Sequence, residues 1–469
     1  MTTSASQVNQ QTIAADRPET PADITNLGQQ LNEIEPLLPS FYLGMQLFPT
    51  LPKLIGIQSP QRYLLVVQNS DELRATGGFI SALGLLTLDK GRLADLAFID
   101  SYRLYRADEE YPPAPAPMRE FMGIPYLLFR DANWSPDFPT TAKLLQAIYR
   151  QETGVAVDGI VTVDLHAVET VVGALAPLRM PNVAEPLTGA NVLTQIKALW
   201  AQPEAGETIT DVGLGQWWNQ RKNFIPTLAA AVVAKLQSGE IDYVAVALAV
   251  EQALNERGIQ IWLTDETAAT QLAALGWDGG LKVMPATDYL GLIDTNMGYN
   301  KVNAVIQRSL QYTVSWPADA TAPPEALVTI DYRHPLTITD HTCDLTPRYG
   351  TDYEDLTERC FYNYVRLYVP GGSTLLEATG LQSSSMRATR GEAGTQVFSG
   401  YFVIPPGESQ QVTFRYQLPL QLAEILAPDR YTLLVQRQAG SGALPLTLAI
   451  GDAHTSLLLE ENTFYWNGR

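Results

Sequence analysis

The segment NSDELRATGG, residues 69–78, contains the residues best suited to bind an anion. It follows RYLLVV, a continuous apolar run that predicts a strand buried on both faces over residues 62–67. In open α/β sheets, ligands bind at the carboxyl ends of the strands. The Arg74 guanidinium can hold a phosphate or a carboxylate through two hydrogen bonds, and Gly77 and Gly78 would let backbone N–H groups approach the same ligand.

Two polar residues of this segment, Asn69 and Asp71, are further candidates for binding that ligand. The alternative is a structural turn in which Arg74 pairs with a local acid such as Asp71. No Gly-Lys-Ser/Thr sequence follows the glycines, so the segment is not a Walker phosphate-binding loop. An anion site and a structural turn therefore both remain open.

A second candidate site is the segment DANWSPDFP, residues 131–139, which precedes a helix predicted over residues 140–150. Asn133 and Asp137 offer an amide and a carboxylate beside the amino terminus of that helix, where anions are favoured. Asp137 would equally well initiate the turn and cap the helix. A ligand-binding role and a capping role are the two alternatives for this segment.

A third candidate is the cation pair Arg221 and Lys222, which lies beside two tryptophans in a long helix predicted over residues 211–237. The pair can contact an anion, or it can lie on a solvated helix face while the tryptophans enter the core. Pro226 is expected to kink this helix.

The composition and the remaining motifs exclude several classes of protein. The chain has 31 Lys and Arg against 50 Asp and Glu, and this net charge of -19 repels nucleic-acid backbones. Its four histidines lack the spacing of zinc ligands, so no metal site is expected. No Gly-X-Ser-X-Gly segment and no Ser/His/Asp arrangement is apparent, which disfavours covalent hydrolysis.

The order of elements predicts a multidomain α+β protein. Residues 1–22 are expected to form a disordered tail and residues 23–57 a helical segment. Strands alternate with helices over residues 58–300, which predicts an α/β sheet with helices on its faces. Over residues 301–469, short alternating runs separated by turn residues predict an antiparallel β-sandwich.

The two cysteines, Cys343 and Cys360, bear on the compartment. The polar, turn-rich stretch between them favours a disulfide, which is typical of oxidising compartments, and two buried thiols are the alternative. We therefore expect an extracytoplasmic protein at the cell surface. No export signal or membrane span is visible in the sequence, so membrane attachment would require an upstream anchor.

Several segments resemble the bacterial family called domain of unknown function 4012. Residues 68–93, 131–142 and 294–301 resemble its signature stretches, and residues 364–376 and 431–440 resemble its carboxy-terminal region. Members of this family look like single-span proteins with most of the chain outside the cell. The resemblance therefore implies an extracellular location.

The order of elements over about residues 60–240 resembles, more distantly, that of the LytR–CpsA–Psr family. Enzymes of that family move glycopolymers from polyprenyl pyrophosphate onto the cell wall. The resemblance implies that Arg74, Arg103 and Arg221 form a catalytic set whose positive charges stabilise the transferring phosphoryl group.

The same resemblance implies a magnesium ion, but the acidic residues that help to hold it are absent. Ala75 follows Arg74, and Leu104 follows Arg103, at positions where those enzymes carry acids. Asp71 or Asp100 would have to take over the role of metal ligand. No cofactor is therefore firmly expected.

Together these observations predict a cell-envelope protein that binds an anionic glycan linked to polyprenyl pyrophosphate, or a related cell-wall polymer, and that also transfers it if the arginine set is active. The alternative is a non-enzymatic surface module for adhesion or assembly, with a degenerate transferase-like domain. The arginines favour transfer, and the missing acidic residues favour the alternative.

Overall fold

The computed structural model describes residues 49–201 apart from 182, together with 223–318, 322–339, 341–345, 353–423 and 430–468. The chain divides into two compact units, Met1–Pro49 and Thr50–Arg469. The predicted tail and most of the helical segment predicted over residues 23–57 lie outside the described residues. Within that segment the structure describes the short helix α3 (Leu51–Leu54).

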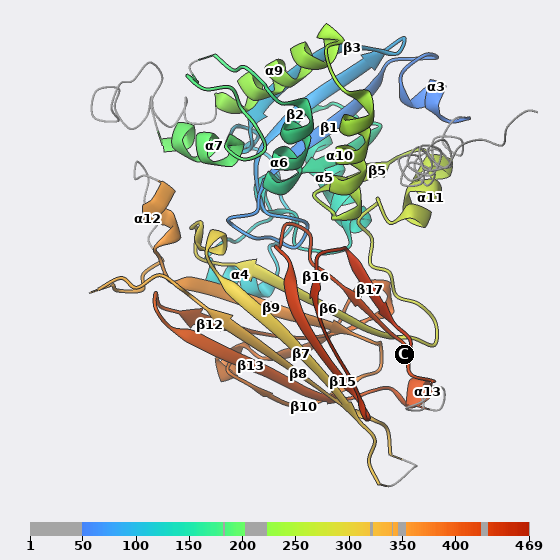
Figure 1. Ribbon diagram of the computed structural model, residues 1–469, viewed down its shortest axis with the longest axis vertical. Coiled ribbons are helices and arrows are strands. Elements are labelled where there is room, and N and C mark those ends of the chain that lie inside the picture. The colour runs from blue at the N-terminus through green and yellow to red at the C-terminus, as the bar shows by residue number, and fades with distance from the viewer. Residues whose placement is uncertain are drawn as a thin grey trace, which may run out of the picture. The chain divides into compact units, whose positions relative to one another are not determined.

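The first sheet of the second unit is mixed and has five strands (Figure 1). The strands are β1 (Gln61–Asn69), β2 (Phe79–Asp89), β3 (Arg92–Asp100), β4 (Gly159–Val163) and β5 (Ile259–Leu263), in the spatial order β3-β2-β1-β4-β5. β1 and β4 are parallel, and the other neighbours are antiparallel. This part of the chain therefore has the α/β character that the sequence predicted.

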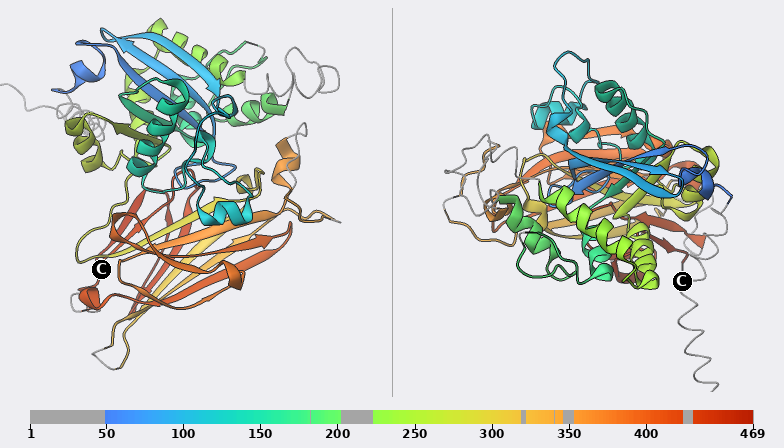
Figure 2. Two further views of the ribbon diagram at one scale, coloured as in Figure 1. Left: turned by 180° about the vertical axis from the view of Figure 1, so that it is seen from behind. Right: turned by 90° about the horizontal axis from the view of Figure 1, so that it is seen from above.

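Helices cover both faces of this sheet, as Figures 1 and 2 show from opposite sides. On one face, α5 (Phe138–Thr153) packs against Leu64 and Val66 of β1 in a buried cluster. Leu65 and Val67 point to the other face, because side chains alternate along a strand. That face is covered by α6 (Leu165–Leu175), α7 (Val192–Ala201) and α9 (Phe224–Ser238).

Three further helices complete this half of the chain. α10 (Tyr243–Asn255) packs on α6, α11 (Glu266–Leu275) packs on β5, and α4 (Ala116–Phe121) precedes α5 in the sequence. Pro226 does not interrupt a helix as we expected, because it lies in the first turn of α9. The N–H that proline lacks has no intrahelical partner at that position.

The carboxy-terminal half contains two six-stranded sheets. The first consists, in spatial order, of β11 (Arg387–Arg390), β12 (Gln396–Ile404), β9 (Phe361–Val369), β6 (Asp288–Asn296), β14 (Leu433–Gln436) and β17 (Thr463–Trp466). The second consists of β10 (Thr374–Thr379), β13 (Ser409–Gln417), β8 (Glu325–Arg333), β7 (Gln307–Ser315), β15 (Leu444–Ile450) and β16 (Ala453–Leu459). Two short helices, α12 (Tyr353–Thr357) and α13 (Leu420–Ala423), accompany them.

The two sheets bury their facing side chains in one hydrophobic cluster, which includes Tyr312 and Val314 of β7 and Val365 and Leu367 of β9. The strands are not all antiparallel as we predicted, because β6 pairs in parallel with β14, and β7 with β15. β6 also precedes residue 301, the first residue of the carboxy-terminal domain that we predicted.

Candidate functional site

Arg74 is buried where the amino-terminal and carboxy-terminal halves of the chain meet. The residue is 1% exposed. Its guanidinium donates to the Glu72 carboxylate (Nη2–Oε1 3.0 Å) and to the Asn296 carbonyl (Nη1–O 2.8 Å), and it lies 3.9 Å from Asp131. Arg74 therefore does not project into a cleft. It takes the structural alternative, with Glu72 as its partner instead of Asp71.

Glu72 binds a second cation from the distant part of the chain. Lys301 Nζ lies 2.6 Å from Glu72 Oε2. Burial raises the pKa of the Glu72 carboxyl, but the charges and hydrogen bonds of Lys301 and Arg74 outweigh burial and lower the pKa below its ordinary value. Glu72 is therefore ionised at neutral pH and holds the loop after β1 to the segment after β6.

The glycine pair of the first candidate segment serves backbone packing. A Cβ atom on Gly78 would collide with the Asn69 carbonyl, and the Gly78 carbonyl accepts a hydrogen bond from Asn133 (2.8 Å). Gly440, from the loop after β14, approaches so closely that a Cβ atom on it would collide with the Gly77 carbonyl. Gly78 is thus required by its close approach to Asn69, and Gly440 by its close approach to Gly77 across the junction between the halves.

The second candidate segment also has structural roles. Asn133 is 1% exposed, and its amide group donates to Gln68 (2.9 Å), Thr76 (3.1 Å) and the Gly78 carbonyl. Asp137 is the amino-terminal cap of α5 and accepts from the Thr140 N–H (3.2 Å). The capping alternative therefore describes Asp137.

The predicted arginine set is not assembled among the described residues. Arg103 ends the single turn η2 (Ser101–Arg103) and is exposed, whereas Arg74 is buried. Arg221 and Lys222 lie outside the described residues. Of this set, the structure describes Arg74 and Arg103, and these two side chains do not share a cleft.

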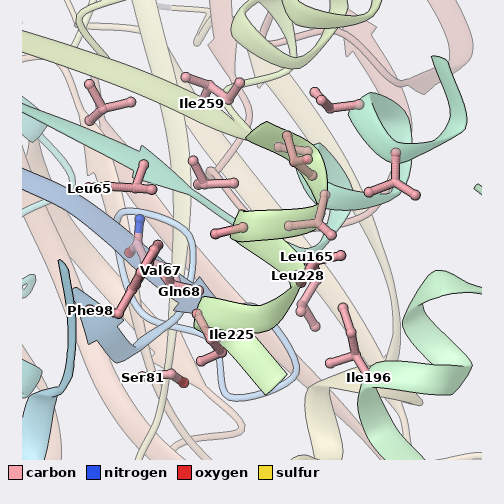
Figure 3. Close-up of a pocket in the computed structure, with 18 of the residues that line it drawn as sticks. Leu65, Val67, Gln68, Ser81, Phe98, Leu165, Ile196, Ile225, Leu228 and Ile259 are labelled. Atoms are coloured by element: carbon pink, nitrogen blue, oxygen red, sulfur yellow. The ribbon is translucent and has the colours of Figure 1, made fainter. Parts of the chain in front are cut away.

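A pocket of about 450 Å3 lies between the five-stranded sheet and helices α6, α7 and α9 (Figure 3). Side chains from both layers line it, and nearly all of them are apolar. They include Leu65, Val67 and Phe98 from the strands and Ile196, Ile225 and Leu228 from the helices. Its volume falls in the range of small-molecule sites, which are mostly apolar with a few placed polar groups.

The polar side chains of this pocket gather where β1 ends. Asn69, Lys197 and Tyr353 line it there. The Asp71 carboxylate pairs with Lys197 (2.8 Å) and accepts from the Tyr353 hydroxyl (2.7 Å), which also accepts from Asn69 (3.2 Å). Burial, followed by the charge of Asp71, raises the pKa of Tyr353, so its hydroxyl remains protonated. Asn69 and Asp71 are therefore the predicted residues that the structure places beside a pocket.

Lys197 and Tyr353 were missed by the sequence interpretation. Lys197 lies in the segment VLTQIKALWA, whose apolar residues have helical spacing and whose one cation lies beside the apolar face. This pattern could have indicated a helix that covers a pocket. Tyr353 carries no such signal, because it lies 282 residues from Asp71.

The predicted disulfide is confirmed. Cys343 and Cys360 are bonded, with their Cα atoms 5.6 Å apart. In the part of the chain that the structure describes, no three His, Cys, Asp or Glu side chains are grouped so as to hold a metal ion. No helix in the same ranges is long and apolar enough to cross a bilayer.

Fold and site together define a mixed α/β protein with three sheets, in which a helix-covered sheet carries an apolar pocket. Residues 58–198 match the family described as "Protein of unknown function (DUF4012)", which confirms the predicted resemblance for that segment. No curated protein matches the chain.

Three solved structures are similar to part of the chain, each at 13% sequence identity. The Lin1025 protein of Listeria innocua matches 47% of this chain and 77% of its own, with a TM-score of 0.27. A protein described as a transcriptional regulator (EF0465) from Enterococcus faecalis matches 48% and 74%, with a TM-score of 0.27. The gbs0355 protein of Streptococcus agalactiae matches 47% and 73%, with a TM-score of 0.26.

Proposed function

We propose that the amino-terminal half binds the hydrocarbon chain of an anionic glycan linked to polyprenyl pyrophosphate. The apolar lining of the pocket between the sheet and helices α6, α7 and α9 carries this proposal. Each buried methylene group of a ligand contributes about 0.8 kcal/mol. A prenyl segment that fills such a pocket would therefore be held firmly without a single polar contact.

The head group would lie where β1 ends, beside Lys197. The Lys197 side chain is 31% exposed, so its ammonium group can reach a ligand while its stem lines the pocket. Asn69 and Tyr353 add polar groups at the same place. A phosphate there would compete with Asp71 for the Lys197 ammonium in a charge-assisted hydrogen bond.

The burial of Arg74 favours binding without transfer. Its guanidinium is engaged by Glu72 and Asn296, and removing one partner of a buried ion pair costs about 3–5 kcal/mol. An arginine held in this way does not turn towards a ligand. This observation favours a protein that binds the glycan without transferring it, which is the non-catalytic form of the function that we predicted from the sequence.

Under this proposal, the five-stranded sheet and its helices form a LytR–CpsA–Psr-like domain, and the two carboxy-terminal sheets form a β-sandwich. The protein would work outside the cytoplasm, at the cell surface. The Cys343–Cys360 disulfide supports this location, because disulfides persist in oxidising compartments.

Calorimetric titration with geranylgeranyl pyrophosphate and with geranylgeraniol tests the proposal. Ala229 lines the pocket, and its neighbour Ala230 is exposed on the same helix. Ala229→Phe fills part of the pocket and is expected to weaken both ligands at least about tenfold. Ala230→Phe adds the same group outside the pocket and is expected to leave both affinities unchanged.

Lys197→Met distinguishes the contribution of the pyrophosphate head group to binding from that of the hydrocarbon chain. We expect it to weaken the pyrophosphate about tenfold and to leave the alcohol unchanged. If the wild type binds neither ligand, or if Ala229→Phe and Ala230→Phe bind alike, the pocket is not a lipid site and the proposal fails.

A further inference from the structure

A second pocket, of about 470 Å3, lies on the outer face of the sheet that contains β9, β11 and β12. Tyr364 and Arg366 of β9 form part of its floor. They alternate with Val365 and Leu367, which enter the core between the sheets, so their own side chains point outward. Trp134 and helix α4 line the pocket from the amino-terminal half.

Arg366 is a buried cation that pairs with no carboxylate among the described residues. It is 3% exposed, and its only hydrogen bonds run to the Tyr368 hydroxyl (3.4 Å) and to Thr295 Oγ1 (3.2 Å) among the described residues. Its Nε atom has no partner in the same ranges, and its guanidinium lies 3.9 Å from the centre of the Trp134 ring. A buried charge of this kind is costly unless an anion pairs with it.

Aromatic rings make up much of the remaining wall. The ring centres of Phe121 and Trp134 lie 6.0 Å and 5.9 Å from that of Tyr364. Hydroxyl groups also line the pocket, and those of Tyr364 and Ser399 share a hydrogen bond (2.9 Å). The pocket therefore combines flat apolar surfaces with donors and acceptors.

The rim of the pocket is more basic than the rest of this acidic chain. Arg387 and Arg390 lie on the edge strand β11 and are exposed. Two carboxylates accompany them: Glu120, 3.6 Å from Arg387, and Glu392, which accepts from a tyrosine hydroxyl. With Arg366, the lining has three arginines against two glutamates among the described residues, in a chain of net charge -19.

We infer that this pocket binds an acidic sugar, a pyranose that carries a carboxylate or a phosphate. The acid would pair with Arg366, whose planar guanidinium suits either group. The C–H face of the sugar ring would lie against the aromatic rings, and its hydroxyl groups would bond to Glu392 and Ser399. This inference uses none of the residues of the lipid pocket and does not depend on that proposal.

Calorimetric titration of the full chain with digalacturonate, glucose 1-phosphate and lactose tests the inference. We expect binding of digalacturonate, of glucose 1-phosphate or of both, and none of the neutral lactose. Binding by one acid alone identifies the carboxylate or the phosphate as the group recognised. If neither acid binds, or if lactose binds equally well, the inference is overturned.

Two substitutions on β11 provide a matched pair. Thr389 lines the pocket, whereas its neighbour Ala388 does not, because adjacent strand residues face opposite sides. Thr389→Trp is expected to weaken the acidic sugar at least tenfold, and Ala388→Trp to leave it unchanged. Equal affinity in the two variants would locate the ligand elsewhere.

Arg366→Met tests the charge itself, since methionine keeps an apolar stem against Trp134. We expect it to weaken the acidic sugar roughly tenfold to a hundredfold. Unchanged affinity in the folded variant contradicts the inference. If the variant does not fold, Thr389→Trp alone decides. Ala229→Phe, in the lipid pocket, is expected to bind the sugar like the wild type.

Discussion

Removing the Lys301 ammonium group should destabilise the protein far more than its small size suggests. Lys301 Nζ lies 2.6 Å from Glu72, and both side chains are less than a tenth exposed. Lys301→Met keeps most of the stem but leaves Glu72 with Arg74 as its remaining cation. Breaking a buried pair costs about 3–5 kcal/mol, and we expect the lower end of this range because Arg74 remains.

A surface pair of nearly the same length is the control. Lys53 Nζ lies 2.7 Å from Asp265, but the Lys53 side chain is 51% exposed. Exposed pairs contribute about 0–1 kcal/mol, so Lys53→Met should have little effect. In urea denaturation followed by circular dichroism, Lys301→Met should lower the midpoint by about 1 M if the slope is about 3 kcal/mol per M. Equal shifts in the two variants would refute our interpretation of the junction.

The pH dependence of the same variants gives a second readout. Because the folded-state pKa of Glu72 is lowered, its contribution to stability is present above its unfolded pKa, near 4.5, and is lost as the pH falls through the folded pKa. The difference between the wild type and Lys301→Met should therefore shrink in acid. A difference that stays constant down to pH 2 would mean that the ion pair is not its cause.

Three further predictions concern single features of the fold. Burial raises the pKa of Glu152 from 4.5 to about 7, so the stability of the protein falls as the pH rises through this interval. In urea titrations, Glu152→Gln should therefore raise the free energy of unfolding at pH 8 by up to about 3 kcal/mol and change it little at pH 4. Replacing Cys343 and Cys360 by serine should lower the free energy of unfolding by about 3 kcal/mol, and the wild type in reductant should lose the same amount. Gly78→Ala, which forces a Cβ atom against the Asn69 carbonyl, should lower the thermal midpoint well beyond the effect of the exposed Ala230→Gly.

The sequence predicted helices and strands best where their buried side chains are apolar. β4, α6 and β5 begin and end where their apolar runs do. β6 was missed although all nine of its residues are buried, because Asp288 and Asp294 interrupt its apolar pattern. Tyr312 donates to Asp288 (2.5 Å), and Tyr332 donates to Asp294 (2.7 Å). These partners come from other strands, so a local pattern could not predict that the carboxylates are tolerated.

The candidate site shows the same limit. An arginine beside acidic residues and glycines is equally compatible with an anion site and with a buried ion-pair network. The sequence does not show which distant residue contacts this segment, and that contact decides between the two. Glu72 forms an ion pair with Lys301, which lies 229 residues away in the sequence. The sequence predicted a helix over the residues of α9, but not that this helix and α6 leave a cavity beside Leu65.

Several of the segments that resemble the family contribute to the junction between the two halves of the chain, although some of their residues also line the pockets. Gln438, in the last of these segments, donates to the Arg74 carbonyl (3.1 Å) and to the Asp294 carbonyl (2.8 Å). Such a network requires particular residue types, because changing one member leaves a buried polar group without its partner. An apolar pocket has no such requirement, since exchanges among hydrophobic side chains of similar volume cost less than about 1.5 kcal/mol. Some motif residues of this chain are therefore explained by how its two halves are joined, and a motif residue such as Arg74 need not contact a ligand.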